Sequence, residues 1–198
     1  MPLWGATDSD ESKPKNLTTA EKKEVFANAS GWVREAGSAL SGNDNTDADP
    51  EVLVAIGELS TSIGAADITE VEMVTTTADK SDGFTISVRV RYNEPVDVVT
   101  TGGTPTLAVT NSNDGTGSGR GPHSLSYASG TGTNELIFSL AIAAANAATN
   151  ADDVLSVGAQ TIALNSGTMK DASGTASDAA LVISGALGTA AGTVTVTA

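Results

Sequence analysis

The segment that decides the fold reads Phe84-Thr85-Ile86-Ser87-Val88-Arg89-Val90-Arg91, with apolar and polar side chains in alternation. Successive side chains of an extended strand point to opposite faces of a sheet. The alternation therefore places the apolar side chains on one face and both arginines on the other. We predict a β-strand here whose apolar face is buried.

Further short segments rich in β-branched residues follow this strand and are separated by clusters of Gly, Asn, Asp and Pro. Many short strands at this spacing are typical of an antiparallel β-sandwich. We therefore expect residues 67–198 to form one sandwich domain, and the chain as a whole to be mainly β. The additional strands are expected at residues 69–76, 96–100, 105–110, 124–128, 134–142, 160–164, 180–184 and 193–197.

Residues 17–66 show a different, helical pattern. Thr18 and Glu21 have the spacing of a capping box, in which each side chain bonds the backbone amide of the other residue. An apolar stripe with a repeat of three and four residues follows and predicts a helix over roughly 19–40. Asp49-Pro50 suits the start of a second helix, whose stripe ends at Gly64. We predict a helical hairpin whose apolar faces need a partner.

The first 16 residues are expected to form an extended arm. An exposed tryptophan is unfavourable unless it docks, and aromatic side chains dominate interface energetics. We therefore predict that Leu3 and Trp4 are buried against a neighbouring subunit, whereas in the alternative Trp4 packs on its own helical hairpin. The complete set of predicted partner contacts is Leu3, Trp4, Phe26, Trp32 and Val33.

The composition excludes several classes of function. The chain of 198 residues has 24 acidic and 10 basic side chains, a net charge of −14, one histidine and no cysteine. Such a charge repels nucleic-acid phosphates, and no set of ligands for a cofactor or a cysteine-bound metal is present. Residues 136–151 are too short to span a bilayer, and the N-terminus lacks the pattern of a secretory signal. We expect intracellular synthesis.

Few residues are candidates for a chemical site. His123 is lone and is expected to be a hydrogen-bonded loop residue. The acidic loop 43–49 has oxygen side chains at alternating positions but lacks the glycine and the glutamate of a calcium loop, so helix capping is favoured. Glu94 and Glu135 are the paired acids that a glycosidase would need. We expect no catalytic, cofactor or metal site.

Several stretches carry a resemblance to a known family. They are Tyr92-Asn93-Glu94-Pro95-Val96, Gly103-Thr104-Pro105-Thr106-Leu107 and residues 125–138 and 160–174. In this order they resemble the bacterial Ig-like repeats of surface proteins and of phage virion proteins. Proline cannot donate to a ladder, so Glu94-Pro95 is expected to end one, and Leu136 and Phe138 are expected to be buried. The resemblance implies a binding or spacing module.

The N-terminal segment Met1-Pro2-Leu3-Trp4-Gly5 resembles the start of virion structural proteins of tailed phages that infect marine cyanobacteria. This resemblance implies a decoration or cement protein on the capsid exterior. Its partners would be the major capsid protein and neighbouring copies of itself, as a homo-oligomer or in a lattice. The alternatives are a neck, tail or baseplate protein, or an adhesin that binds a host-surface glycan through Tyr92, Tyr127 and His123.

Overall fold

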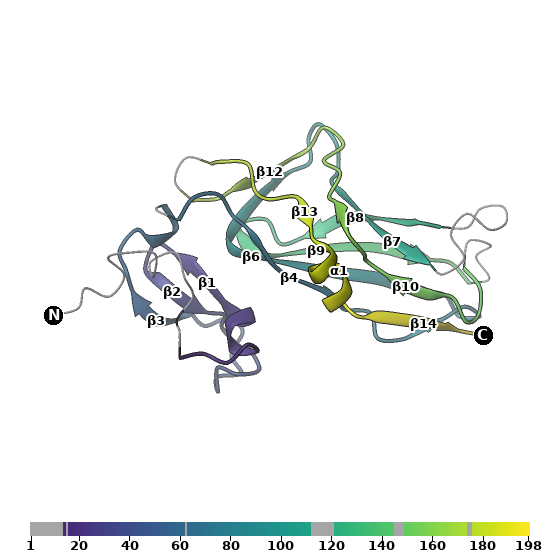
Figure 1. Ribbon diagram of the computed structural model, residues 1–198, viewed down its shortest axis with the longest axis horizontal. Helices are drawn as coiled ribbons and strands as arrows, with labels where there is room; N and C mark the ends of the chain where they lie inside the picture. The colour runs from purple at the N-terminus through teal and green to yellow at the C-terminus, as the bar shows by residue number, and fades with distance from the viewer. Residues whose placement is uncertain (1–13, 15, 62, 112–120, 145–148, 174–175) are drawn as a thin grey trace.

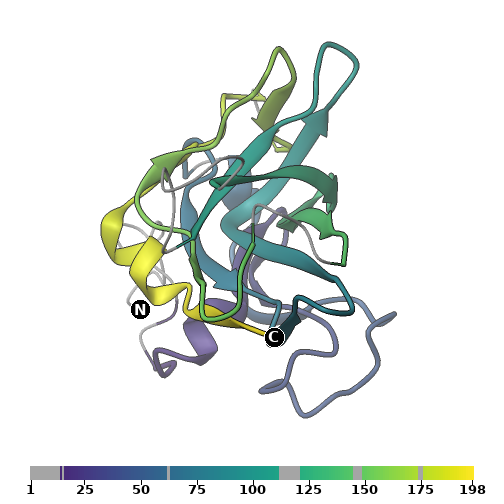
Figure 2. The same ribbon diagram turned by 90° about the vertical axis from the view of Figure 1, so that its right-hand side faces the viewer.

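The computed structural model of the protein describes residues 14, 16–61, 63–111, 121–144, 149–173 and 176–198. Within them the chain is mainly β, as predicted. A small N-terminal sheet lies at one end of the long axis, and the C-terminus lies at the other (Figure 1). In Figure 2, which looks along that axis, the C-terminus is near the viewer.

The N-terminal sheet consists of three antiparallel strands in the order β1-β2-β3, which span Val25–Asn28, Gly31–Arg34 and Glu51–Ala55. Two single-turn 3₁₀ helices flank it, η1 (Glu21–Glu24) and η2 (Leu59–Thr61). One face of the sheet buries Val25, Ala27 and Trp32 together with Leu59. These residues form a small core of their own.

The prediction of a helical hairpin over residues 17–66 is wrong. The capping box is present, because the backbone N–H of Glu21 donates to Thr18 Oγ1 at 3.2 Å and the backbone N–H of Thr18 donates to Glu21 Oε2 at 2.8 Å. It opens only the 3₁₀ turn η1, however. The chain then enters a β-hairpin, because Asn28 Oδ1 accepts a bond from the N–H of Ser30 at 2.8 Å and so forms an Asx turn.

The main sheet pairs its strands in the order β12-β6-β9-β8-β7-β10-β14-β5, and β4 also pairs with β6. All neighbours are antiparallel except β14 and β5, which are parallel. A separate pair, β11 and β13, lies outside this order. The bounds are β4 (Ile68–Met73), β5 (Ala78–Asp79), β6 (Phe84–Val99), β7 (Thr106–Asn111), β8 (His123–Ser129), β9 (Thr133–Ile142), β10 (Val154–Ser156), β11 (Gln160–Thr161), β12 (Thr168–Asp171), β13 (Val182–Ile183) and β14 (Thr193–Thr197).

Eight of the nine strands of the main sheet form two halves, β4-β6-β9-β8 and β7-β10-β14-β5, joined by the pairing of β7 with β8, and β12 extends the first half at β6. Both halves contribute to one continuous core, with Val88 and Phe138 from the first and Leu107 and Val196 from the second. The sheet must therefore fold over so that the halves face each other. The helix α1 (Gly185–Ala190) lies against β4. The carbonyl of Ala191, which follows this helix, accepts a bond from the N–H of Met73 in β4 at 2.8 Å.

Strand β6 confirms the alternation of the deciding segment. Ile86, Val88 and Val90 are fully buried in the core, and the arginines between them point to the opposite face. The strand does not end at Pro95 as expected but continues to Val99. Only its pairing with β9 is interrupted there, by a shift in register between Arg91 and Val96. Leu136 and Phe138 of β9 are buried, as predicted.

Candidate functional site

The N-terminal sheet meets the main sheet at a network of charged side chains, which we call the charged network. It consists of Lys23, Glu35, Glu70, Glu72, Arg89, Arg91 and Glu135. Strand β1 lies beside β6, on whose outer face Arg89 and Arg91 stand. The register pairs Glu72 with Arg89, and it places Glu70 on one side of Arg91 and Glu135 on the other. Opposite charges on neighbouring strands are thus placed together by the pairing itself.

Arg91 is the centre of this charged network. Its Nη1 donates to Glu70 Oε2 at 2.8 Å, its Nε donates to Glu135, and its Nη2 lies 3.5 Å from Glu35 Oε2. Arg91 is only 8% exposed, so these contacts are largely shielded from water. One guanidinium therefore connects β4, β6 and β9 to the residue that follows β2.

Further contacts attach the N-terminal unit, which comprises η1, β1–β3 and η2 (residues 21–61), to the same network. Lys23 Nζ of η1 lies 2.6 Å from Glu70 Oε1, and Asn134 Nδ2 of β9 donates to Glu35 Oε1 at 2.7 Å. Arg89 pairs with Glu72, and its Nη1 lies 3.5 Å from Glu135 Oε1. Two points of the N-terminal unit, η1 and the residue after β2, are thus bound to the main sheet.

The pKa values of the network reflect its burial and its charge balance. Burial alone would raise the pKa of the Glu70 carboxyl, but hydrogen bonds from Lys23 and Arg91 outweigh burial and lower it. Burial raises the pKa of Glu35, which the bond from Asn134 and the charge of Arg91 only partly offset. Glu70 is therefore a carboxylate whose charge is stabilised by the fold.

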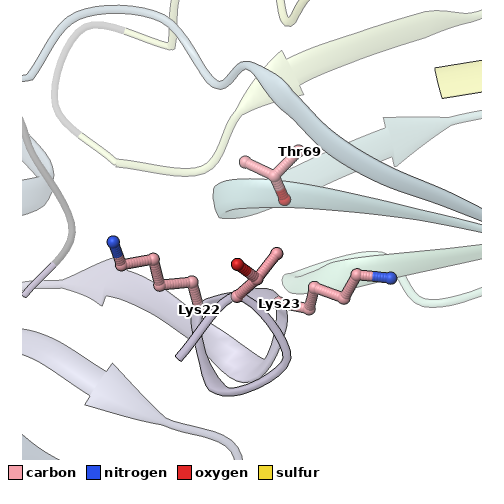
Figure 3. Close-up of a pocket in the computed structure, with 4 residues that line it drawn as sticks. Lys22, Lys23 and Thr69 are labelled. Carbon is pink, nitrogen blue, oxygen red and sulfur yellow. The ribbon is translucent and has the colours of Figure 1, made fainter. Parts of the chain in front are cut away.

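A shallow depression of about 350 Å³ lies between η1 and β4 and is lined by Thr19, Lys22, Lys23 and Thr69. Figure 3 shows the two lysine side chains extending in opposite directions. Lys23 is already paired with Glu70. The ammonium groups do not converge on one point, so the depression lacks the arrangement that would recognise an anion.

A second polar cluster, which we call the buried acid cluster, consists of Ser60, Glu94, Asp171 and Ser173. Glu94 is 0% exposed and Asp171 is 3% exposed. The Ser173 hydroxyl lies 2.5 Å from Asp171 Oδ1, 2.7 Å from the carbonyl oxygen of Ser60 and 3.2 Å from Glu94 Oε2. Burial, followed by the charge of Asp171, raises the pKa of Glu94 to about 7.

The residues proposed for a glycan or catalytic site are not arranged as one. Tyr92 is buried and its hydroxyl donates to the Ala180 carbonyl at 2.9 Å. His123 is buried too, with its Nε2 3.2 Å from Thr149 Oγ1. Glu94 has no solvent exposure, whereas Glu135 is bound in the charged network. The buried side chains offer no surface to a saccharide.

The acidic loop 43–49 uses its side-chain oxygens in turns. Asn43 Oδ1 accepts a bond from the N–H of Asn45 at 3.1 Å, and Asn45 Oδ1 accepts one from the N–H of Asp47 at the same distance. No group of three or more His, Cys, Asp or Glu side chains within the described ranges is arranged to hold a metal ion. Nor does any helix there have the length and apolar character to cross a bilayer.

The predicted partner contacts fall into two groups. Leu3 and Trp4 lie outside the described residues. Phe26, Trp32 and Val33 are at most 8% exposed. Trp32 belongs to the small N-terminal core, and Phe26 and Val33 form a cross-strand pair on the opposite face. These three side chains are used inside the chain and leave little of their surface for a partner.

Sequence reasoning missed the two polar clusters. Arg89 and Arg91 were placed on the outer face, but their acidic partners come from strands at distant positions in the sequence. Glu94 lies close to Asp171 because β12 pairs with β6, and this pairing places Asp171 opposite Val96. Comparison with known protein families, with curated proteins and with solved structures found no match.

Proposed function

We propose that this chain is a non-enzymatic structural protein of a virus particle, and specifically a decoration or cement protein on the outer surface of the capsid shell. The observation that carries the proposal is the strand order of the main sheet, which supports the Ig-like domain that the resemblance implies. In constant-type Ig domains, strands A, B, E and D form one sheet and strands C, F and G the other. The halves β4-β6-β9-β8 and β7-β10-β14 follow this order.

The way the two parts are joined supports a load-bearing role. Ion pairs from η1 and from the residue after β2 bind the N-terminal unit to the main sheet, and the Ser60 carbonyl after them contacts Ser173. Two parts joined in this way would transmit force from the N-terminal unit, which docks in this proposal, to the main sheet, which faces outward. A modest interface of roughly 800 Å² per partner is enough where a shell repeats the same site many times.

The surface charge suits the outside of a particle. The net charge of −14 keeps neighbouring particles apart and gives no attraction to a nucleic acid inside the shell. The partners in this proposal are the major capsid protein and neighbouring copies of the chain. The docking end would be the N-terminal unit together with the preceding arm that contains Leu3 and Trp4.

Two other roles give different measurable outcomes. A neck, tail or baseplate protein would be present in the few copies of one symmetric ring, whereas a shell component follows the copy number of the capsid protein. An adhesin would bind host-surface glycans. The burial of Tyr92 and His123 favours the structural role over that of an adhesin.

The test is a binding experiment with purified particles that encode the chain. Particles would be stripped of the protein and then incubated with the recombinant chain carrying a gold label after Ala198. We expect saturable binding over the whole shell at a fixed ratio to the capsid protein. A variant lacking residues 2–6 should bind at least about tenfold more weakly, because an aromatic contact contributes on the order of 2 kcal/mol. Label confined to the tail, or absence of the chain from washed particles, would contradict the proposal.

A further inference from the structure

The buried acid cluster places more hydrogen-bond acceptors around Ser173 than this residue can satisfy, although its backbone N–H also donates to Asp171 Oδ1 at 2.6 Å. Ser173 Oγ carries one proton but faces three oxygen atoms, from Ser60, Glu94 and Asp171. A hydroxyl donates a single bond. At least two of these oxygen–oxygen contacts therefore have no proton from Ser173 between them.

Glu94 makes this deficit severe. The residue is fully buried, and its Oε1 has no hydrogen-bond partner. A carboxylate held away from water without a partner is among the most unfavourable groups that a protein can bury. The carboxylate of Asp67 lies close enough for its charge to act on Glu94 as well. The site is thus a concentration of negative charge and oxygen lone pairs.

No positively charged side chain among the described residues pairs with the cluster. The ion pairs among the described residues involve neither Glu94 nor Asp171. The charged network shows how this chain balances buried carboxylates elsewhere, since Glu70 has both Lys23 and Arg91. At Glu94 no described side chain supplies such a charge, which leaves a bound cation or a proton to balance it.

We propose that Glu94 and Asp171, with the Ser60 carbonyl and the Ser173 hydroxyl, bind a divalent cation of the calcium type. All four residues offer oxygen, the ligand that hard cations prefer. Two of them are carboxylates, and Glu94 Oε1 is the unpartnered atom that the ion would satisfy. Small rotations of these side chains would replace the contacts to the Ser173 hydroxyl by contacts to the ion.

Calcium fits this site better than magnesium does. Calcium accepts six to eight oxygen atoms in irregular geometry, including carbonyl oxygens, whereas magnesium requires an octahedron and keeps several waters. The ligands here come from three separate segments, and Glu94 and Asp171 are almost without solvent contact. A site with irregular ligands and little room for water favours the larger ion.

The position of the site gives the ion a mechanical role. Ser60 belongs to η2 of the N-terminal unit, Glu94 to β6, and Ser173 follows β12. A bound ion would join the N-terminal unit to the main sheet on the η2 side, in addition to the charged network. The cation therefore strengthens the junction between the two parts of the chain. This inference does not depend on the proposed location in a virus particle.

The experiment uses the full chain after treatment with a chelator, and calcium chloride as the probe. Calorimetric titration and thermal melting would be measured for the wild type, for Glu94→Gln and Asp171→Asn, for Asp44→Asn and Asp47→Asn of the acidic loop, and for the control Asp178→Asn. Asp178 loses the same charge, but its side chain is 85% exposed and pairs only with Lys170. Magnesium chloride at the same concentration serves as a second control.

We expect one calcium ion per chain, and a rise in Tm of roughly 5–10 °C at a calcium concentration about 100 times Kd. Glu94→Gln and Asp171→Asn should weaken binding at least about tenfold, whereas Asp178→Asn should bind as the wild type does. Circular dichroism in chelator confirms that each variant is folded.

Three outcomes would overturn the proposal. The wild type could show neither heat nor a change in Tm with calcium. Glu94→Gln could bind calcium as tightly as the wild type. Binding could instead be lost in Asp44→Asn or Asp47→Asn of the acidic loop. A metal-free protein that gains stability on protonation and ignores calcium would show that a proton occupies the cluster instead.

Discussion

Arg91 is the residue on which the junction depends most. Its guanidinium contacts Glu35, Glu70 and Glu135, and these acids come from both parts of the chain. Burial alone would lower its pKa, but the surrounding carboxylates raise the pKa and keep the group charged. A buried ion pair adds little to the free energy of unfolding compared with apolar side chains in place of both partners. Removing only one partner is strongly destabilising, because the other charge is left buried and unpaired.

We therefore expect Arg91→Met to lower the free energy of unfolding by about 3–5 kcal/mol at pH 7, because it leaves buried carboxylates without a counter-charge. Urea denaturation followed by circular dichroism measures the change. Arg89→Met is the matched control, since the side chain of Arg89 is 27% exposed against 10% for Arg91. It should cost about 1 kcal/mol or less. Equal losses would show that Arg91 has no special role.

Glu70 gives the junction a predictable pH dependence. The folded chain lowers the pKa of this carboxyl below its unfolded value, so the charged form is favoured in the folded state. The resulting stability is complete above the unfolded pKa of about 4.3 and is lost as the pH falls through the folded pKa.

Glu70→Gln should therefore destabilise the chain at pH 7 and have a progressively smaller effect below about pH 4. Urea denaturation at a series of pH values gives the difference from the wild type. Asp82→Asn, at an exposed acid in the turn before β6, provides the comparison. A Glu70→Gln effect that stayed constant from pH 7 to pH 3 would mean that the charge of Glu70 does not contribute to folding.

At the scale of elements, the β1–β2 hairpin is the structure that replaces the predicted helix. Gly31 begins β2 with a φ of +131°, and a Cβ at this position would lie 2.0 Å from the carbonyl oxygen of Val54 in the region of β3. Both the backbone conformation and the close approach of β3 require glycine. A single residue thus fixes the turn and the packing of the third strand.

Gly31→Ala should destabilise the N-terminal unit by more than about 2 kcal/mol, since it combines backbone strain with an overlap against main-chain atoms. Gly57→Ala is the control, because a Cβ there meets nothing within 4 Å and no positive φ is required. That variant should be neutral or slightly stabilising. The emission of Trp32, measured with Trp4→Phe as background, reports on the unit directly. An unaffected Gly31→Ala protein would contradict the described turn.

The comparison of sequence and fold shows where periodicity is informative. The alternation of residues 84–91 predicted β6 because a long strand with one buried face repeats its pattern many times. The same reasoning wrongly predicts a helix over residues 25–34, because two four-residue strands and a turn also produce apolar side chains at a spacing of three and four. The β-branched and aromatic residues at 25–26 and 32–33, with Asn28 before a turn, were the signals that favoured a hairpin.

The two polar clusters were beyond prediction from a single sequence for a related reason. Arg91 meets Glu35 and Glu135 only after separate strands have paired, and Asp171 reaches Glu94 only through the β12–β6 register. The sequence identified Glu94 and Glu135 as acids of interest within one motif. It did not indicate that the first belongs to the buried acid cluster and the second to the charged network.

At the scale of the whole molecule, the two parts are one mechanical body. The N-terminal unit has its own core around Trp32, but its ion pairs with the main sheet are partly or largely buried. Its strand β1 lies beside β6, the longest strand of the main sheet. Buried contacts of this extent couple the unfolding of the two parts.

We expect a single calorimetric transition for the full chain, with equal calorimetric and van't Hoff enthalpies. The Trp32 emission in the Trp4→Phe background should change at the same temperature as the circular dichroism of the strands. Combining Lys23→Met with Glu35→Gln removes two links, and this variant should lose Trp32 burial before the main sheet unfolds. Two transitions in the wild type would show that the parts fold independently.

The placement of Ala198 has a practical consequence. Strand β14 ends next to it, at the opposite end of the long axis from β1–β3, and the terminal residue is exposed. A reporter enzyme or an antigen genetically fused behind Ala198 would be held far from the junction and would leave β1, β2 and β3 unobstructed. This end of the molecule is therefore the suitable attachment point for a cargo that must not disturb the N-terminal unit.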